Sequence, residues 1–261
     1  MQRIKKTMFY KSHIKLIQSL RQSKFRKQMK LFVAEGPKVV GELLNSHYTL
    51  HLLFATSEYL ADLKKQISSE KLIMVKAPEL DRISQLKTPN QVVGVFEIPV
   101  EPQIPKIEIE DLTLVLEDIG DPGNMGTIIR TADWFGIKEI ICSENCVDIY
   151  NPKVVQSTMG SLARVKITYL DILTFFEQNI SGTMSFAAVM NETSVYTLSL
   201  PKKAVLVIGS ESHGISPEVL QKVDKKISIP AIEKPHGSKA ESLNASVAAA
   251  ILCSEFRRQN N

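Results

Sequence analysis

The chain has 261 residues and a formal net charge of +4; 44% of its residues are hydrophobic and 23% are charged, which is typical of globular proteins. No stretch approaches the roughly 18–20 unbroken apolar residues of a membrane span, so we expect no membrane partner. The basic N-terminus lacks an apolar core followed by a small-residue cleavage site, and the chain has three cysteines, which together favour the reducing cytoplasm.

The first 98 residues alternate between amphipathic segments and short apolar runs. A basic helical pattern covers 9–30, and Gly36-Pro37 suits the first turn of a second helix. Further predicted helices lie near 57–66 and 78–84, and predicted strands lie at 31–34, 50–54, 72–75 and 92–96. This alternation predicts a small α/β domain over residues 1–98.

Residues 99–110 contain Pro99, Pro102 and Pro105 and show no helical period, which predicts a stiff, extended linker. The second predicted domain, residues 111–261, repeats the α/β alternation. Its predicted strands are 112–116, 139–142, 165–167, 185–189, 204–208 and 226–230. Because nearly every strand is followed by a helix, we expect a mostly parallel sheet.

Positive charge is concentrated at one end of the chain. Residues 1–40 contain eleven Lys or Arg and a single acid, Glu35, so they carry +10 while the other 221 residues sum to −6. A basic patch of this kind suits a polyanion, of which nucleic acid is the commonest example. Lys24, Arg26 and Lys27 are the candidate RNA contacts; a solvated helix face or a lipid-facing surface is the alternative.

A glycine-containing segment, EDIGDPGNMG, separates the strand at 112–116 from the next helix. Its glycines, Gly120, Gly123 and Gly126, do not have the G-x-G-x-x-G spacing of a dinucleotide site. A phosphate-binding P-loop would need Lys and then Ser or Thr after the last glycine, and Thr127-Ile128 follows instead. The segment Gly209-Ser210-Glu211-Ser212-His213-Gly214 likewise fails the G-x-S-x-G pattern of a hydrolase.

Three predicted strands nevertheless end in glycines or polar residues. Asn124 and Arg130 follow the first strand of the second domain, Gly209 and Glu211 follow the strand at 204–208, and Ile229 through Asn244 follow the last strand. In open α/β sheets, ligands bind outside the carboxyl ends of the strands. We therefore expect these three segments to form one site.

The same three segments together resemble the SpoU, or TrmH-like, branch of the SPOUT RNA methyltransferases. The motifs are Asn124-Met125-Gly126 with Arg130, the run from Leu206 to Gly214, and Ile229-Pro230 followed by 241–250. The segment 32–36 with its following helix looks like the RNA substrate-binding domain that often precedes this catalytic domain. The resemblance implies methyl transfer from S-adenosylmethionine to a ribose 2′-OH, a deep trefoil knot in the parallel-sheet domain, and a homodimer.

The resemblance also implies roles for individual residues. Arg130 would bind the target phosphate or stabilise the developing alkoxide, because a guanidinium is a poor base at neutral pH. Glu211 would brace Arg130 or a loop amide. Asn124 would order the loop or cap its helix. Ser242 and Asn244 would open the last helix, with Ser242 well suited to capping it, and would also contact the substrate ribose or Arg130. Gly209, Ile229 and Leu243 would line the donor pocket; Ile229 and Leu243 also suit core packing. No metal is expected.

The sequence departs from the family pattern at 231–240, a longer and more charged insert that lies where the donor pocket should close. Ribosomal RNA is the expected substrate, since many enzymes specific for transfer RNA lack the N-terminal domain. Two alternatives stay open: a transfer-RNA 2′-O-methyltransferase, and an RNA-binding member of the fold that has lost activity. A third possibility, an unrelated nucleotide-dependent enzyme, requires a nucleotide site whose glycine spacing matches neither of the two patterns tested above.

Overall fold

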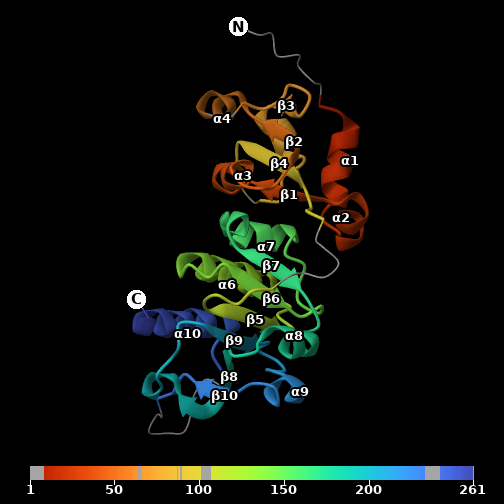
Figure 1. Cartoon of the computed structure of the whole chain (residues 1–261). Helices are drawn as coiled ribbons and strands as arrows, with labels where there is room; N and C mark the ends of the chain where they lie inside the picture. The colour runs from red at the N-terminus through yellow and green to blue at the C-terminus, as the bar shows by residue number, and fades with distance from the viewer. Residues whose placement is uncertain are drawn as a thin grey trace. The chain divides into compact units, whose positions relative to one another are not determined.

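The computed structural model describes residues 9–63, 66–86, 88, 90–100, 107–232 and 242–260. The chain forms two compact units (Figure 1). Unit 1 comprises Met1–Glu101 together with Asp148–Ala163, and unit 2 comprises Pro102–Val147 together with Arg164–Asn261. The second domain predicted from the sequence includes the segment Asp148–Ala163, whereas the structure packs this segment with the N-terminal part of the chain. In the described residues, no helix is long and apolar enough to cross a membrane.

Unit 1 is built on a four-stranded sheet in the order β1-β4-β2-β3, with β1 and β2 antiparallel to β4 and β3 parallel to β2. The strands are β1 Leu31–Glu35, β2 Leu50–Ala55, β3 Leu72–Met74 and β4 Val92–Glu97. The helices are α1 Lys11–Ser19, α2 Ser23–Met29, α3 Pro37–Leu44, α4 Ser57–Asp62, α5 Ala77–Asp81, α7 Pro152–Ser157 and the 3-10 turn η1 Ser161–Ala163. The single basic helix predicted over 9–30 is therefore two helices, α1 and α2.

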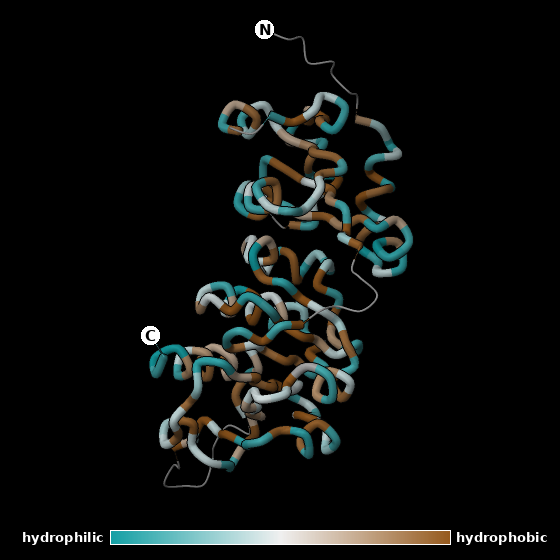
Figure 2. The backbone as a smooth tube through the Cα atoms, viewed as in Figure 1, coloured by the Kyte–Doolittle hydropathy of each residue, from teal (hydrophilic) through white to brown (hydrophobic). Residues whose placement is uncertain are grey.

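The turn from β1 into α3 requires a glycine. Gly36 has a φ of +85°, in the region that side chains disfavour, and Pro37 is the first helical residue, as its fixed φ predicts. All five residues of β1 are buried, which explains why this strand is a continuous run rather than an alternating pattern. The hydrophobic tube segments of Figure 2 follow the strands of both units.

Arg26 of α2 is an internal anchor of unit 1. Its side chain is only 2% exposed, and its Nε and Nη2 atoms donate to Asp148 Oδ2 at 2.9 and 2.6 Å. Its Nη1 atom donates to the carbonyl oxygens of Leu20 and Arg21 at 2.9 and 2.8 Å. The guanidinium thus joins the turn between α1 and α2 to the segment Asp148–Ala163. Its partners compensate for removing the charge from water.

Unit 2 contains a six-stranded sheet in the order β10-β8-β9-β5-β6-β7, and every neighbouring pair is parallel. The strands are β5 Thr113–Glu117, β6 Glu139–Cys142, β7 Lys166–Tyr169, β8 Met184–Ser194, β9 Ala204–Gly209 and β10 Lys225–Ser228. The helices are α6 Pro122–Trp134, α8 Ile172–Asn179, α9 Pro217–Leu220, α10 Ala245–Asn260 and the 3-10 turn η2 Val195–Thr197. The mostly parallel α/β sheet predicted from sequence is confirmed.

The order of the strands brings two distant loops together. Strands β5 and β9 are neighbours, and Glu117 at the end of β5 pairs with Gly209 at the end of β9. Because the two strands are parallel, the chain leaves both of them at the same edge of the sheet. The segments that follow Glu117 and Gly209 therefore start side by side.

We expect Arg26→Ala to lower the free energy of unfolding by about 2 to 4 kcal/mol, because it leaves Asp148 and two carbonyl oxygens without their shared donor. Denaturant titration of the full chain, followed by circular dichroism, measures the change. Lys27→Ala is the matched control, since Lys27 is an exposed neighbour on the same helix. Equal unfolding midpoints for the two variants would contradict a structural role for Arg26.

Candidate active site

The turn that follows β5 is made by an aspartate rather than by a glycine. Asp118 has a φ of +56°, whereas Gly120 and Gly123 have ordinary negative-φ backbones. The Asp118 N–H donates to Ser143 Oγ at 2.9 Å, and Ser143 Oγ donates to Asp118 Oδ1 at 2.8 Å. Aspartate tolerates this backbone region better than most residues, and the two hydrogen bonds hold it there.

Helix α6 begins three residues earlier than it would if Asn124 were its N-cap. Its N-cap is Asp121, whose Oδ1 accepts a hydrogen bond from the Asn124 N–H at 2.8 Å, and Pro122 is its first residue. The suggestion that Asn124 caps this helix was therefore wrong. Asn124 lies in the first turn, which leaves its side-chain amide available to another segment.

Gly209 is required by a close approach of the chain to itself. A Cβ atom at this position would lie 2.1 Å from the Gly214 carbonyl oxygen and 2.6 Å from the Ile215 nitrogen. The loop is closed by a hydrogen bond from the Gly214 N–H to the Ser210 carbonyl at 2.9 Å. The space into which a side chain at position 209 would point is thus filled by backbone. The tight loop carries Glu211 at its exposed tip.

Helix α10 is capped by Asn244. Its Oδ1 accepts hydrogen bonds from the backbone N–H groups of Ser246 at 3.0 Å and Val247 at 3.3 Å. Ser242, which we expected to cap this helix, is exposed and makes no hydrogen bond among the residues that the structure describes. The register of the helix start explains the correction, because Ser242 lies three residues before the first helical residue and cannot reach its first free N–H groups.

The side chains of Asn124, Glu211 and Asn244 meet, and we call them the Glu211 cluster. Glu211 Oε1 accepts hydrogen bonds from Asn124 Nδ2, from Asn244 Nδ2 at 3.3 Å, and from the Ala245 N–H at 3.1 Å. Asn244 Nδ2 also donates to Asn124 Oδ1 at 2.8 Å. Three of the five predicted catalytic residues are therefore in contact, and one carboxylate joins all three motif segments.

The charge of Glu211 matches its position. The Ala245 N–H that it accepts from belongs to the first residue of α10, where free N–H groups and the helix dipole favour a negative group. Of the two partners considered for Glu211, a loop amide and Arg130, the structure shows the amide: the backbone N–H of Ala245 donates to Glu211.

Arg130 is exposed on α6, six residues after Asn124. Across the described part of the chain its guanidinium makes no hydrogen bond or ion pair. In that part of the chain, neither Glu211 nor Ser242 is hydrogen-bonded to it. An exposed, unpaired guanidinium next to a strand-end site is available to a phosphate or an oxyanion of a ligand.

The residues predicted to bind the methyl donor lie at the ends of the third segment. Ile229 is half-buried just beyond β10, and Leu243, 45% exposed, lies two residues before α10. Core packing, the other role considered for Leu243, does not fit that exposure. Of the insert at 231–240, only Ala231 and Ile232 belong to the described residues; Ile232 is 89% exposed.

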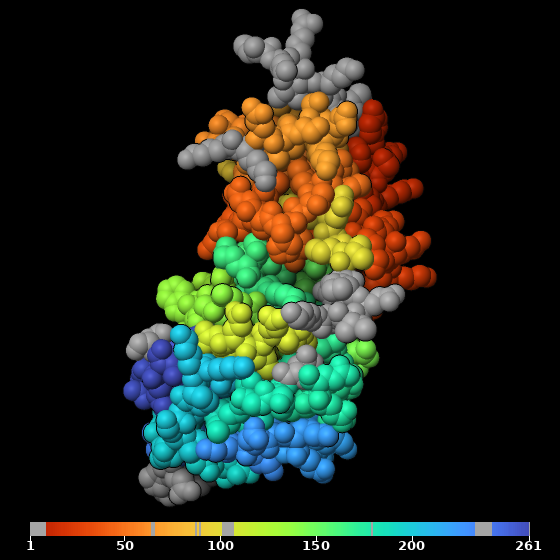
Figure 3. Space-filling view, viewed as in Figure 1, coloured from red at the N-terminus to blue at the C-terminus, as the bar shows by residue number. Residues whose placement is uncertain are grey.

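Only two of the three predicted RNA contacts face solvent. Lys24 and Lys27 are exposed on α2, whereas Arg26 is buried and fully engaged within unit 1. We therefore withdraw Arg26 from the candidate RNA surface. Helices α1 and α2 form one exposed side of unit 1 (Figure 3). Further exposed cations lie on α1, in the turn between the two helices and just after α2: Lys11, Lys15, Arg21 and Lys30. Arg26 differs from Lys24 and Lys27 in having the tertiary partner Asp148. A count of charges along the sequence cannot reveal such a partner.

Two of the three cysteines lie behind the loop that follows β5. Cys146 Sγ donates to the Leu116 carbonyl at 3.3 Å, and a hydrogen bond from Cys142 lowers the pKa of Cys146 to about 7. Cys142 and Cys146 are free thiols and are buried. Among the described residues, no group of three or more His, Cys, Asp or Glu is placed to hold a metal ion.

Comparisons with known proteins agree with this architecture. Residues 111–254 match the SpoU rRNA Methylase family, and residues 11–94 match the MRM3-like substrate binding domain. The chain is 39% identical to the structure of a putative RNA methyltransferase of the TrmH family from Porphyromonas gingivalis, with a TM-score of 0.85 and coverage of 97% and 100% of the two chains.

Two further relatives span almost the whole chain. The AdoMet-bound rRNA methyltransferase from Sinorhizobium meliloti is 27% identical, with a TM-score of 0.83 and 98% coverage of each chain. The 23S rRNA (guanosine(2553)-2′-O)-methyltransferase RlmP of Bacillus subtilis is 28% identical over 246 residues, covering 91% of this chain and 93% of the relative. The resemblance predicted from the three motifs is confirmed: this chain belongs to the SpoU rRNA methylase family.

Proposed function

We propose that this protein transfers a methyl group from S-adenosylmethionine to a ribose 2′-OH of ribosomal RNA. The observation that carries the proposal is the Glu211 cluster, which joins three loops at the carboxyl edge of a parallel sheet. The relatives named above are RNA or rRNA methyltransferases. The match of residues 11–94 to a substrate-binding domain favours ribosomal over transfer RNA. We place the reaction in the cytoplasm, where bacterial ribosomal RNA resides.

The residues around the carboxyl edge of the sheet suit the donor that the S. meliloti relative holds. Ile229 and Leu243 offer apolar side chains that are not fully buried, beside the end of β10 and the start of α10. Such side chains could contact the adenine ring, and the backbone at Gly209 could contact polar groups. When bound, the donor supplies a methyl group on a positively charged sulfur.

Methyl transfer would require the ribose oxygen to be held in line with this methyl group and to release its proton to water as the new O–C bond forms and the methyl–sulfur bond breaks. Arg130 does not take the proton, because a guanidinium is a poor base at neutral pH. It can bind the neighbouring phosphate and stabilise the developing alkoxide by a charge-assisted hydrogen bond. Glu211 acts through position: by holding Asn124 in the first turn of α6, it fixes the helix that carries Arg130.

We also propose that the protein is a homodimer and that unit 2 contains the trefoil knot typical of its family. Trp134 of α6 is 84% exposed and Val247 of α10 is 46% exposed, and α6 packs on α10. Trp134 lies one turn after Arg130 on the same face of α6, so an interface there would lie next to Arg130. A second copy of the chain would cover these exposed apolar side chains on two helices that pack together. A monomeric mass in analytical ultracentrifugation would refute the dimer.

The direct test is methyl transfer from isotope-labelled S-adenosylmethionine to unmodified ribosomal RNA, followed by nuclease mapping. We expect a single 2′-O-methyl mark. Arg130→Ala should reduce turnover by roughly 100-fold or more while donor binding persists, because the lost interaction forms with the transition state. Transfer to tRNA alone would favour the transfer-RNA alternative, and donor binding without transfer to any RNA would favour the inactive RNA binder.

Glu211→Gln should lower turnover by roughly tenfold or more, because an amide replaces the carboxylate and places an N–H group opposite donors. Melting temperature and kcat are measured together on the purified variant. Glu218→Gln is the matched control, since Glu218 is an exposed acid on α9 that makes none of these contacts. Unchanged kcat in Glu211→Gln would show that the cluster does not position the catalytic residues.

Replacing Lys24 and Lys27 together with alanine should weaken RNA binding and reduce the slope of log affinity against log salt by roughly one for each lysine removed. Fluorescence anisotropy with a ribosomal RNA fragment at several salt concentrations gives the slope. Arg26→Ala, assayed where it is folded, should leave the slope unchanged. An unaltered slope in the double lysine variant would show that Lys24 and Lys27 do not contact RNA and that the RNA-binding surface lies elsewhere.

A further inference from the structure

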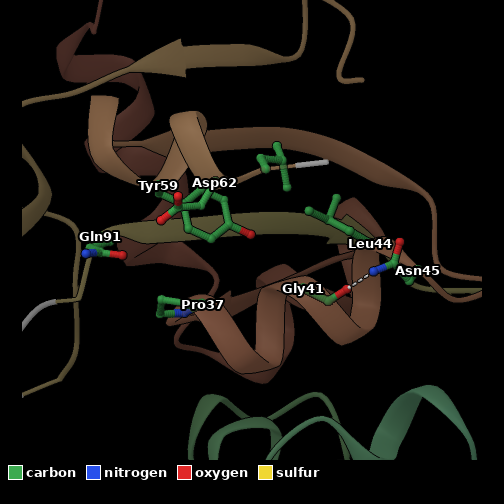
Figure 4. A pocket seen from close by; sticks show the side chains of 8 residues that line it. Pro37, Gly41, Leu44, Asn45, Tyr59, Asp62 and Gln91 are labelled. Atoms are coloured by element: carbon green, nitrogen blue, oxygen red, sulfur yellow. Dashed lines mark hydrogen bonds between the residues drawn. The ribbon is translucent and has the colours of Figure 1, made fainter. Parts of the chain in front are cut away.

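Unit 1 contains a pocket between α3 and α4, well away in sequence from the Glu211 cluster. Its volume is about 320 Å³, at the small end of the roughly 300–1,000 Å³ range of ligand sites. Figure 4 shows side chains from both helices and from the residue before β4 turned toward this space. The residues that matter for its chemistry are Gly41, Leu44, Asn45, Tyr59, Asp62 and Gln91. We call it the α3–α4 pocket.

The pocket contains polar groups that nothing in the described residues satisfies. The ring of Tyr59 is largely buried, and its hydroxyl faces the pocket, where it is open to solvent and has no hydrogen-bond partner among the described residues. The Asp62 carboxylate has none either. Asn45 donates through Nδ2 to the Gly41 carbonyl at 3.0 Å, which leaves its Oδ1 as a free acceptor. Asn45 and Asp62 are exposed, so these donors and acceptors are open to solvent and available to a ligand that enters the pocket.

The charge of the lining decides what kind of ligand fits. Among the lining residues that the structure describes, Asp62 is the one charged side chain, and its carboxylate would repel a phosphate. A flat ring with N–H donors on its edge would be attracted, because the carboxylate of Asp62 and Asn45 Oδ1 are acceptors while Leu44 offers an apolar surface. Nucleobases have this combination of an apolar face and a polar edge.

Guanine matches the pocket best. Its adjacent imino and amino N–H groups can both donate to one carboxylate, and its carbonyl oxygen can accept from the Tyr59 hydroxyl or the Gln91 amide. Adenine and cytosine offer an amino group without the neighbouring imino N–H, and uracil offers a single imino N–H. Proteins read single-stranded RNA in this way, by enclosing an unstacked base and bonding to its edge.

We propose that the α3–α4 pocket binds an unpaired guanine base of the substrate RNA. The proposal rests on the proposed function, since it assigns part of the RNA recognition to unit 1. The base is distinct from the methylated nucleotide, whose ribose goes to the Glu211 cluster of unit 2. The match of residues 11–94 to a substrate-binding domain supports an RNA site in this unit. Lys38, exposed on α3 next to Pro37, can contact the adjoining phosphate.

The test uses the full chain and two fluorescent seven-nucleotide RNAs, an oligouridine and the same oligomer with one central guanosine. Anisotropy should show roughly tenfold tighter binding of the guanosine oligomer, as expected for a carboxylate bonded to a base edge. Asp62→Asn should abolish that difference, and Tyr59→Phe should reduce it by roughly fivefold or less. Glu58→Gln, an exposed acid on α4 outside the pocket, is the matched control and should preserve the preference.

A second variant tests the location without removing a polar group. A Cβ atom at Gly41 would meet no atom within 4 Å, so the side chain of Gly41→Leu starts in open space and extends from the pocket wall. Leucine also favours a helix more than glycine does, so α3 should not be weakened. Gly41→Leu should remove the guanosine preference, while Gly41→Ala, which adds one methyl group, should keep most of it.

The outcomes separate this proposal from the proposed function. Equal binding of the two oligomers, a preference for adenosine or cytidine at the central position, or a guanosine preference that survives Gly41→Leu would each overturn the guanine site. Methyl transfer to ribosomal RNA with no guanosine preference would contradict the guanine site and support the methyltransferase assignment. A guanosine preference that depends on Asp62, without methyl transfer, would support the guanine site and contradict the methyltransferase assignment.

Discussion

One carboxylate oxygen, Oε1 of Glu211, holds the candidate active site together. It accepts hydrogen bonds from the first turn of α6, through Asn124, and from the start of α10, through Asn244 and the Ala245 N–H. These segments are separated by up to 120 residues in sequence. Amide and backbone N–H groups gain more from a charged acceptor than from a neutral one. The carboxylate can therefore fix two helix starts at once.

This convergence depends on the sheet beneath it. Strands β5 and β9 are parallel neighbours, so their loops leave from one edge, and Gly209 lets the second loop fold tightly enough to present Glu211 there. Any side chain at Gly209 would displace the Gly214 carbonyl. Strand order and one close backbone approach thus bring the residues of the Glu211 cluster together. The polar contacts between them then hold this arrangement.

Partners decide what each arginine can do. Arg26 is surrounded by a carboxylate and two carbonyl oxygens, so its charge is used to hold unit 1 together. Arg130 has no such partner in the described chain and keeps its charge for a ligand. Within unit 1, the exposed lysines of α2 suit the phosphate backbone of RNA, whereas the α3–α4 pocket, with Asp62, suits a base. Backbone contacts hold RNA, and base contacts select it.

The sequence by itself determined the class of the fold, the parallel sheet and the three segments that form the site, because apolar periodicity and short motifs are local properties of the chain. It also identified Asn124, Glu211 and Asn244 as members of one site. It did not identify Asp121 and Asn244 as the helix caps, because which polar residue caps a helix depends on where the first turn starts, to within one or two residues. The structural role of Arg26 and the reason for Gly209 were likewise decided by the tertiary structure. Each depends on a partner more than 100 residues away or on a backbone fold that no local pattern encodes.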